Sequence, residues 1–257
     1  MWERVQSIVN LVEDLRNTNA EAAAYHRLVQ CILEGTTSEM NSLFVKVVTS
    51  SKPNRRHLPH ATGHQALPNI QIDLSLEHRI PTRHTDVFAQ LPYSLLLLLR
   101  RAFSSAWSIG PFSDTSLVLC MAVVRTPFSE SPRAEAELQA AVGGACMIAD
   151  RLEQVDLMLS MKPVLPPLSL RTISFPVITL IVIGDTWYYQ IAYRSSRTCC
   201  VVLPARLAGE CGTHVGTFKL LVFITALRKW CRDVYYQEYT DILQELGATV
   251  GWKRPVD

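Results

Sequence analysis

Apolar side chains recur at helical spacing in two blocks near the N-terminus. In residues 2–16 the apolar positions are Trp2, Val5, Ile8, Val9, Val12 and Leu15. In residues 20–34 they are Tyr25, Leu28, Val29, Ile32 and Leu33. Steps of three and four residues put such side chains on one face of a helix. The pattern therefore predicts two amphipathic helices, and Gly35 is a natural end for the second.

Several shorter segments carry the β-branched or alternating pattern of strands. The predicted strands are residues 42–49, 69–76, 117–125, 177–183, 187–193 and 199–203. Because Gly184-Asp185-Thr186 is short and turn-forming, we expect the two strands beside it to form a hairpin. Residues 50–68 contain three prolines and one glycine, so we expect a loop there.

Helical spacing returns later in the chain. It predicts a helix over residues 132–152, with Pro132 tolerated in its first turn, and a short helix over residues 91–103. A last helix is predicted to begin near Thr213 and to continue past residue 243. Its expected core-facing positions are Phe218, Leu221, Ile224, Leu227, Val234 and Ile242.

The order of these elements is helix, helix, strands, helix, hairpin, strand, helix. This order is typical of a mixed sheet flanked by helices, in the α/β or α+β class. We expect one domain over residues 1–257, with residues 1–35 as an N-terminal helical pair. Residues 36–257 would then supply the sheet and its flanking helices.

The composition is that of a globular protein. With 257 residues, of which 48% are hydrophobic and 19% charged, the chain can bury a sizeable core. It has 25 basic and 23 acidic residues, well dispersed, for a net charge of +2. Tight nucleic-acid binders gather basic residues into a stripe, so a nucleic-acid partner is not favoured. The dense basic run at residues 52–57 is interpreted as a solvated turn.

Cysteine usage and hydropathy bear on the cellular location. Seven cysteines without a C-x-x-C pair argue against a disulfide framework and a zinc ribbon. The N-terminus lacks a signal-peptide layout, and the longest apolar run, residues 175–183, is far shorter than the ~20 residues that span a bilayer. We expect a soluble cytoplasmic protein with no membrane partner. His57, His60 and His64 have a spacing that zinc can use, but nearby prolines favour a solvated loop.

The first residue that could take part in catalysis or metal binding is Asp73, which lies in a strand-like segment. The strand-like segment at 117–125 ends in Val123-Val124-Arg125, and the helix after it contains Gln139. An acid on one strand, an E-x-K on the next and a helix behind them form the site of metal-dependent nucleases. There the carboxylates hold Mg²⁺, and the lysine orients or activates the attacking water. Motifs of serine hydrolases, P-loop NTPases, Rossmann enzymes and zincins are absent from the sequence.

Taken in order, these segments resemble the PD-(D/E)XK nuclease-like group, and its fungal members in particular. The matching segments are residues 20–33, 72–74, 108–125, 136–139, 183–188, 212–219 and 230–236. The resemblance implies a restriction-endonuclease-like mixed sheet flanked by helices. It also implies that Asp73 stands at the first metal-binding aspartate, and that Gln139 is the helix glutamine near the site.

The sequence departs from the family's pattern at two positions. Val123 stands where the family has a glutamate, and Arg125 stands where it has a lysine. Valine cannot bind a cation, and arginine stays protonated, so it clamps an anion instead of accepting a proton. We therefore expect no metal and no other cofactor. The alternative is that Glu130, Glu135 or Glu137 has taken the missing role.

The expected function is that of a repurposed fold. It is a metal-independent protein for an apolar small molecule, in the class of a pericyclase-like cyclase or isomerase, and the resemblance implies terpenoid or polyketide biosynthesis in fungi. The expected catalytic residues are Asp73, Arg125 and Gln139, and the expected substrate-binding residues are Val123, Trp187 and Tyr189. Two alternatives remain: a Mg²⁺-dependent nuclease with a migrated carboxylate, and a non-catalytic binding or scaffold module in which Asp73 and Arg125 form a buried ion pair.

Overall fold

The computed structural model describes residues 1–18, 20–34, 43–48, 72–79, 116–128, 131–160, 176–196, 199–238 and 241. Its elements, in chain order, are α1 (Trp2–Asn17), α2 (Ala22–Glu34), β1 (Leu43–Val47), β2 (Leu74–Arg79), β3 (Ser116–Arg125), α4 (Pro132–Ser160), β4 (Val177–Ile183), β5 (Thr186–Arg194), β6 (Cys200–Val202), β7 (Arg206–Glu210), α5 (His214–Trp230) and the π-helix η3 (Cys231–Tyr236).

The strands form one seven-stranded mixed sheet. Its order is β1-β2-β3-β4-β5-β6, and β7 pairs with β5 beside β6. Strands β3 and β4 are parallel, with Arg125 opposite Ile183, and the other pairs are antiparallel. The parallel pair requires a crossover, and α4 lies in it. The hairpin between β4 and β5 turns at Gly184, whose φ of 60° favours glycine.

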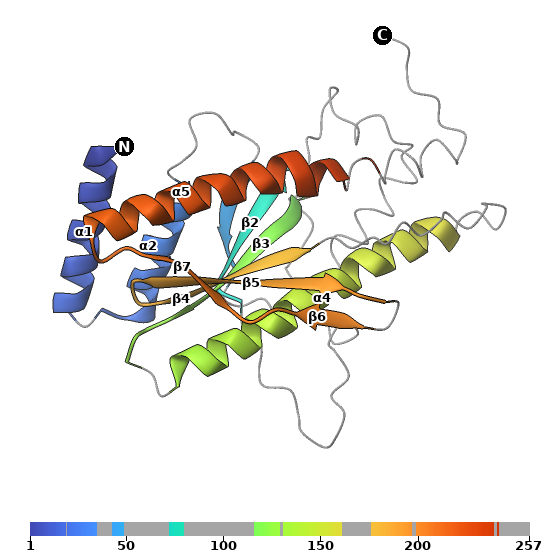
Figure 1. Ribbon diagram of the computed structural model, residues 1–257, viewed down its shortest axis with the longest axis horizontal. Coiled ribbons are helices and arrows are strands. Elements are labelled where there is room, and N and C mark those ends of the chain that lie inside the picture. Colours follow the sequence, from blue (N-terminus) through green and yellow to red (C-terminus); the bar gives the residue numbers. More distant parts are fainter. Residues whose placement is uncertain are drawn as a thin grey trace, which may run out of the picture.

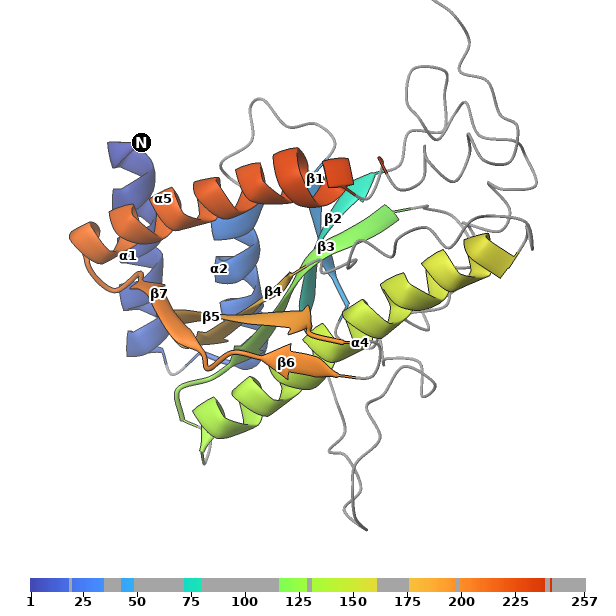
Figure 2. The same cartoon turned by 45° about the vertical axis from the view of Figure 1, so that its right-hand side comes forward.

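Helices cover both faces of the sheet (Figure 1, Figure 2). Helix α4 lies on one face, close enough that a Cβ added to Gly144 would stand 3.0 Å from the Cβ of Ala192 on β5. Helices α1, α2 and α5 lie on the other face, where the rings of Tyr189 and Phe223 have centroids 5.2 Å apart. Buried side chains from both layers join one hydrophobic core. The fold is therefore a single α/β domain with a mixed sheet between helices, as the sequence predicts.

Most predicted elements are confirmed. The two N-terminal helices, the strand at 117–125, the hairpin and the helix from Pro132 all form, and α4 runs eight residues beyond the predicted end at 152. The predicted loop at 50–68 and the short helix at 91–103 lie outside the described residues. Within the described ranges, no helix combines the length and the apolar composition needed to cross a bilayer.

Three predictions about elements need correction. Of the strand predicted at 69–76, residues 69–71 lie outside the described residues, and residues 72 and 73 precede β2, which begins at Leu74. Strand β7 was not predicted, since its sequence mixes charged, small and apolar residues. The last helix is not one uninterrupted α-helix: α5 ends at Trp230, a π-helix that buries Cys231 follows, and residues 237, 238 and 241 are α-helical again. Its predicted end beyond residue 243 lies outside the described residues.

The core-facing stripe expected on the last helix is also partly wrong. Phe218 and Val234 are 49% and 39% exposed, although Leu221, Ile224 and Leu227 are buried as expected. Helix α5 carries apolar side chains on its outer side as well as its inner side. The helical spacing of apolar residues therefore did not by itself identify which of these side chains face the sheet.

Candidate functional site

Asp73 lies between the two strands that flank β2. Its backbone N–H donates to the carbonyl of Ala122 at 3.1 Å, and its carbonyl accepts the N–H of Val48 at 2.8 Å. Its side chain turns onto β3, where Oδ2 accepts the backbone N–H of Val124 at 2.8 Å. A side-chain oxygen thus takes an N–H that a regular strand would pair with a carbonyl, which explains why β2 begins one residue later.

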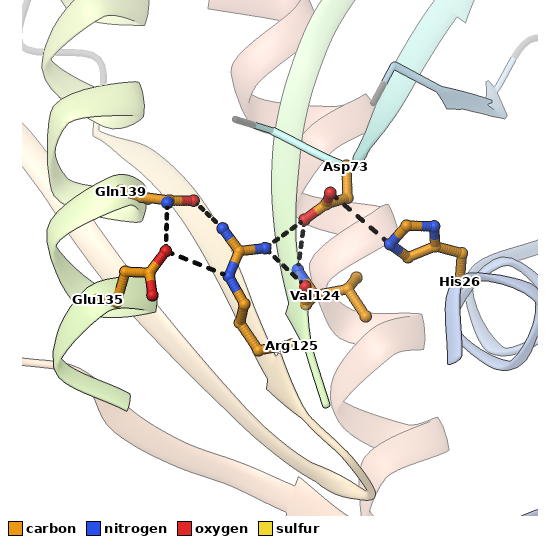
Figure 3. Close-up of polar contacts among 6 residues, drawn as sticks. All are labelled: His26, Asp73, Val124, Arg125, Glu135 and Gln139. Carbon is orange, nitrogen blue, oxygen red and sulfur yellow. Dashed lines mark hydrogen bonds and ion pairs between the residues drawn. The ribbon is translucent and has the colours of Figure 1, made fainter. Parts of the chain in front are cut away.

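Arg125, the last residue of β3, is surrounded by oxygen atoms (Figure 3). Its Nη1 donates to Asp73 Oδ2 at 3.1 Å and to the carbonyl of Val124 at 2.7 Å. Its Nη2 donates to Gln139 Oε1, and its Nε lies 3.8 Å from Glu135 Oε1. The guanidinium therefore joins the strand ends to α4.

Helix α4 presents Glu135 and Gln139 from consecutive turns. These two residues are four apart, so they lie on one face of the helix, and Gln139 Nε2 donates to Glu135 Oε1 at 3.0 Å. Gln139 is buried, whereas half of the Glu135 side chain is exposed. The amide thus orders both its neighbours, accepting from Arg125 and donating to Glu135.

His26 approaches Asp73 from the opposite side (Figure 3). Its Nε2 lies 3.6 Å from Asp73 Oδ1, and 17% of its side chain is exposed. Sequence reasoning did not single out His26 as a functional residue. The signal available was that a titratable side chain borders the apolar stripe of α2, beside Tyr25 and Val29, in the segment that carries the family resemblance.

Burial dominates the electrostatics of Asp73. It raises the pKa of this carboxyl above its ordinary value, because the ionised form loses its hydration. The hydrogen bond from the Val124 N–H and the charges of Arg125 and His26 lower the pKa again, without cancelling the effect of burial. The result is an acid whose charged form depends on the three groups around it.

The residues at this site do not fit a divalent cation. Four oxygens converge here, from Asp73, Val124, Glu135 and Gln139, and hard cations bind such oxygens. However, the Arg125 guanidinium, itself a cation, lies among them. Across the described part of the chain, no group of three His, Cys, Asp or Glu side chains is arranged to hold a metal.

Val123 lies beside this site as a fully buried side chain on β3. Residues two apart on a strand share a face, so Val123 faces α4, as Arg125 does. The side chain two residues before Arg125 on this face is therefore aliphatic and offers no oxygen to a cation.

The expected substrate-binding residues do not come together. Strand pairing sets Val123 opposite Ile181, and Ile181 opposite Tyr188. Tyr188 is on the α4 face, with Arg133 of α4 4.7 Å from its ring centroid. Trp187 and Tyr189 therefore point to the other face, where Trp187 is fully buried. A pocket shared with Val123 would have to cross the sheet.

The three glutamates that were alternatives for the missing metal ligand do not gather at the site. Glu135 reaches the Arg125 guanidinium, as described above. Glu137 pairs instead with Arg133 at 2.7 Å, one turn along the same helix. Glu130, like the histidines at 57, 60 and 64, lies outside the described residues.

Comparison with known proteins identifies the family of this chain. Searches among curated proteins and among solved structures each found no match. A family model described as the PD-(D/E)XK nuclease superfamily matches residues 1–236 of the 257. This match covers every element of the sheet and all the residues of the site described above. The chain belongs to the PD-(D/E)XK nuclease superfamily.

Proposed function

We propose that this protein is a metal-independent member of its superfamily that binds an apolar small molecule and rearranges it as a cyclase or isomerase. The substrates would be of the terpenoid or polyketide type, which combine apolar frameworks with carbonyl groups. A role in secondary metabolism is part of the same proposal. The observation that carries it is the position of the Arg125 guanidinium among the oxygens of Asp73, Val124 and Gln139.

A guanidinium at this position acts as a built-in cation. Two cations cannot share one set of oxygens at close range, because like charges repel and the site is mostly buried. Arginine does not lose its proton at any physiological pH. Mg²⁺ would therefore have to displace Arg125 and would still lack the carboxylate that Val123 replaces. Hydrolysis of a phosphodiester, which relies on that metal in this superfamily's pattern, is disfavoured on the same grounds.

The same arrangement suits chemistry on a carbonyl compound. Arg125 is 16% exposed at its side chain, so an N–H of its guanidinium is within reach of a ligand oxygen and would polarise a carbonyl. His26 is similarly exposed, whereas Asp73 beside it is not. In this proposal the His26 imidazole transfers a proton to or from the substrate, and the Asp73 carboxylate orients the imidazole. An isomerase needs one such group and a held substrate, without a metal or an oxidant.

The test is turnover without a metal. Purified protein would be incubated, in EDTA, with a panel of terpenoid and polyketide carbonyl compounds, and the products analysed by liquid chromatography and mass spectrometry. Because cyclisation and isomerisation conserve mass, we expect a product of unchanged mass and altered retention time. His26→Ala and Arg125→Gln should abolish it, and the matched surface variant Arg133→Gln should not.

Two outcomes would overturn the proposal. Cleavage of DNA or RNA in Mg²⁺, lost in EDTA and in Asp73→Asn, would establish a nuclease. The absence of both turnover and saturable binding across the panel would leave a scaffold module, in which the Asp73–Arg125 pair is structural.

A further inference from the structure

A second buried guanidinium, that of Arg228, lies away from the site of Arg125. It belongs to the last turn of α5 and is 1% exposed. Its Nη1 donates to the carbonyl of Leu33, at the end of α2, where α5 passes that helix (Figure 2). The contact joins residues 195 positions apart in the sequence. Arg228 is thus held by the C-terminus of α2.

Arg4 of α1 binds the same helix end. Its Nη2 donates to the carbonyls of Cys31 and Ile32, each at 3.2 Å. The last four carbonyls of a helix have no partner within it. Arg4 and Arg228 together therefore cap three of the four at the end of α2. Capping a carbonyl requires one N–H, which a neutral side chain can also supply.

The cap leaves one edge of the Arg228 guanidinium unused. Neither Nε nor Nη2 of Arg228 has a hydrogen-bond partner within the described structure. These two nitrogens share the side of the guanidinium that binds carboxylate and phosphate through two parallel hydrogen bonds. An intact two-donor edge is therefore buried and directed at no acceptor.

The charge around Arg228 is also unbalanced. Burial lowers its pKa, and the charge of Arg4 lowers it further, while Cys231 and Glu34 act in the opposite sense. The end of a helix carries only about half a negative charge, and Glu34 is exposed, which weakens its effect through screening. A buried charge without a full counter-charge is destabilising, and arginine cannot relieve it by losing a proton.

We propose that the Nε–Nη2 edge of Arg228, next to Arg4 at the end of α2, is a binding site for a small oxyanion of the phosphate or carboxylate class. The anion would accept two hydrogen bonds from Arg228 and offset its charge. Since Nε and Nη2 are enclosed, the anion enters through local opening at the end of α2 and is then held away from water. This site is separate from the one proposed for the small-molecule substrate.

The experiment titrates the full chain with sodium phosphate, sodium sulfate and sodium acetate, against sodium chloride at equal ionic strength. We expect the Nε–H resonance of Arg228, assigned by its loss in Arg228→Lys, to shift saturably with phosphate or acetate but not with chloride. At about ten times Kd, ligand linkage should raise Tm by roughly 3–5 °C. Phosphate acting without acetate would identify a tetrahedral anion, and the reverse a carboxylate.

The matched variants are Arg228→Met and Lys229→Met, neighbouring residues on α5 that change the net charge equally. Lys229 is exposed, so Lys229→Met should keep the anion-dependent rise in Tm, while Arg228→Met should lose it. An equal rise in both variants would overturn the proposal. So would an Nε–H resonance of Arg228 that no oxyanion moves, a result that is measured on the wild-type protein and does not depend on the fold of Arg228→Met.

Discussion

The guanidinium of Arg125 lies 3.1 Å from the carboxylate of Asp73 and also donates to the backbone carbonyl between the two expected motif positions. In this arrangement the residue expected at the family's lysine position is bound to the residue expected at the family's aspartate position. The carboxylate of Asp73 consequently interacts with groups of the protein itself: the Arg125 guanidinium, the Val124 N–H and the His26 imidazole.

Arg125→Gln should destabilise the fold by about 2–4 kcal/mol, because it leaves the buried carboxylate of Asp73 without its main counter-charge. Urea unfolding followed by circular dichroism would measure the change. Arg133→Gln, which breaks the exposed pair with Glu137 and the contact with the Tyr188 ring, serves as the control and should lower the midpoint far less. Equal midpoints for Arg125→Gln and the wild type would show that the Asp73–Arg125 pair contributes nothing net.

Val123→Glu combined with Arg125→Lys should create metal binding. The double variant removes the guanidinium from among the oxygens and adds the second carboxylate that a divalent cation requires. Isothermal titration with Mn²⁺ should give a saturable signal that the wild type lacks. Val123→Gln with Arg125→Lys has the same shape without the new charge, and it should not bind. Strong Mn²⁺ binding by the wild type would contradict the argument.

Stability should depend on pH through Asp73. Its folded-state pKa is raised above the ordinary value of 3.8, so the folded state holds the proton more tightly than the unfolded state does. Its contribution is therefore largest below that ordinary value and is lost as the pH rises through the folded-state pKa. Relative to Asp73→Asn, the free energy of unfolding of the wild type should fall as the pH rises above the ordinary pKa of 3.8. A difference that grows with pH would mean that Arg125 outweighs burial.

Gly216→Ala should destabilise the start of α5 by about 1–3 kcal/mol. An added Cβ would lie 2.5 Å from the backbone carbonyl of Glu210 and 2.9 Å from Thr213 Oγ1. The hydroxyl of Thr213 caps the helix by accepting the Gly216 N–H. Val222→Ala, at an exposed position of the same helix, is the control for helix propensity, and thermal melts would compare the two. A neutral or stabilising Gly216→Ala would show that the β7–α5 connection can shift.

The neighbourhood of Asp73, Arg125 and Gln139 could be predicted from their order on strand, strand and helix. Their partners could not. His26 reaches Asp73 only because α2 packs beside the start of β2, and Glu135 reaches Arg125 because of the rotation of α4 about its axis. Both depend on how helices sit on the sheet, which is decided by side chains distant in sequence.

Trp187 and Tyr189 illustrate the same limit in the sheet. Alternation predicts that these two share a face, and they do. Which face it is depends on the register through β3, β4 and β5, where Tyr188 is aligned with Val123. A shift of one residue reverses the face of every side chain on a strand, so this assignment required the assembled sheet.

By itself, the sequence determined the two N-terminal helices, the hairpin and the class of the fold, because these follow from local periodicity and residue chemistry. Only the tertiary structure decided that the Arg125 guanidinium lies among the oxygens and that Arg228 caps α2 with one edge unpaired. Those contacts join residues from separate elements, up to 195 positions apart. Their geometry is set by packing across the whole core, which no local pattern encodes.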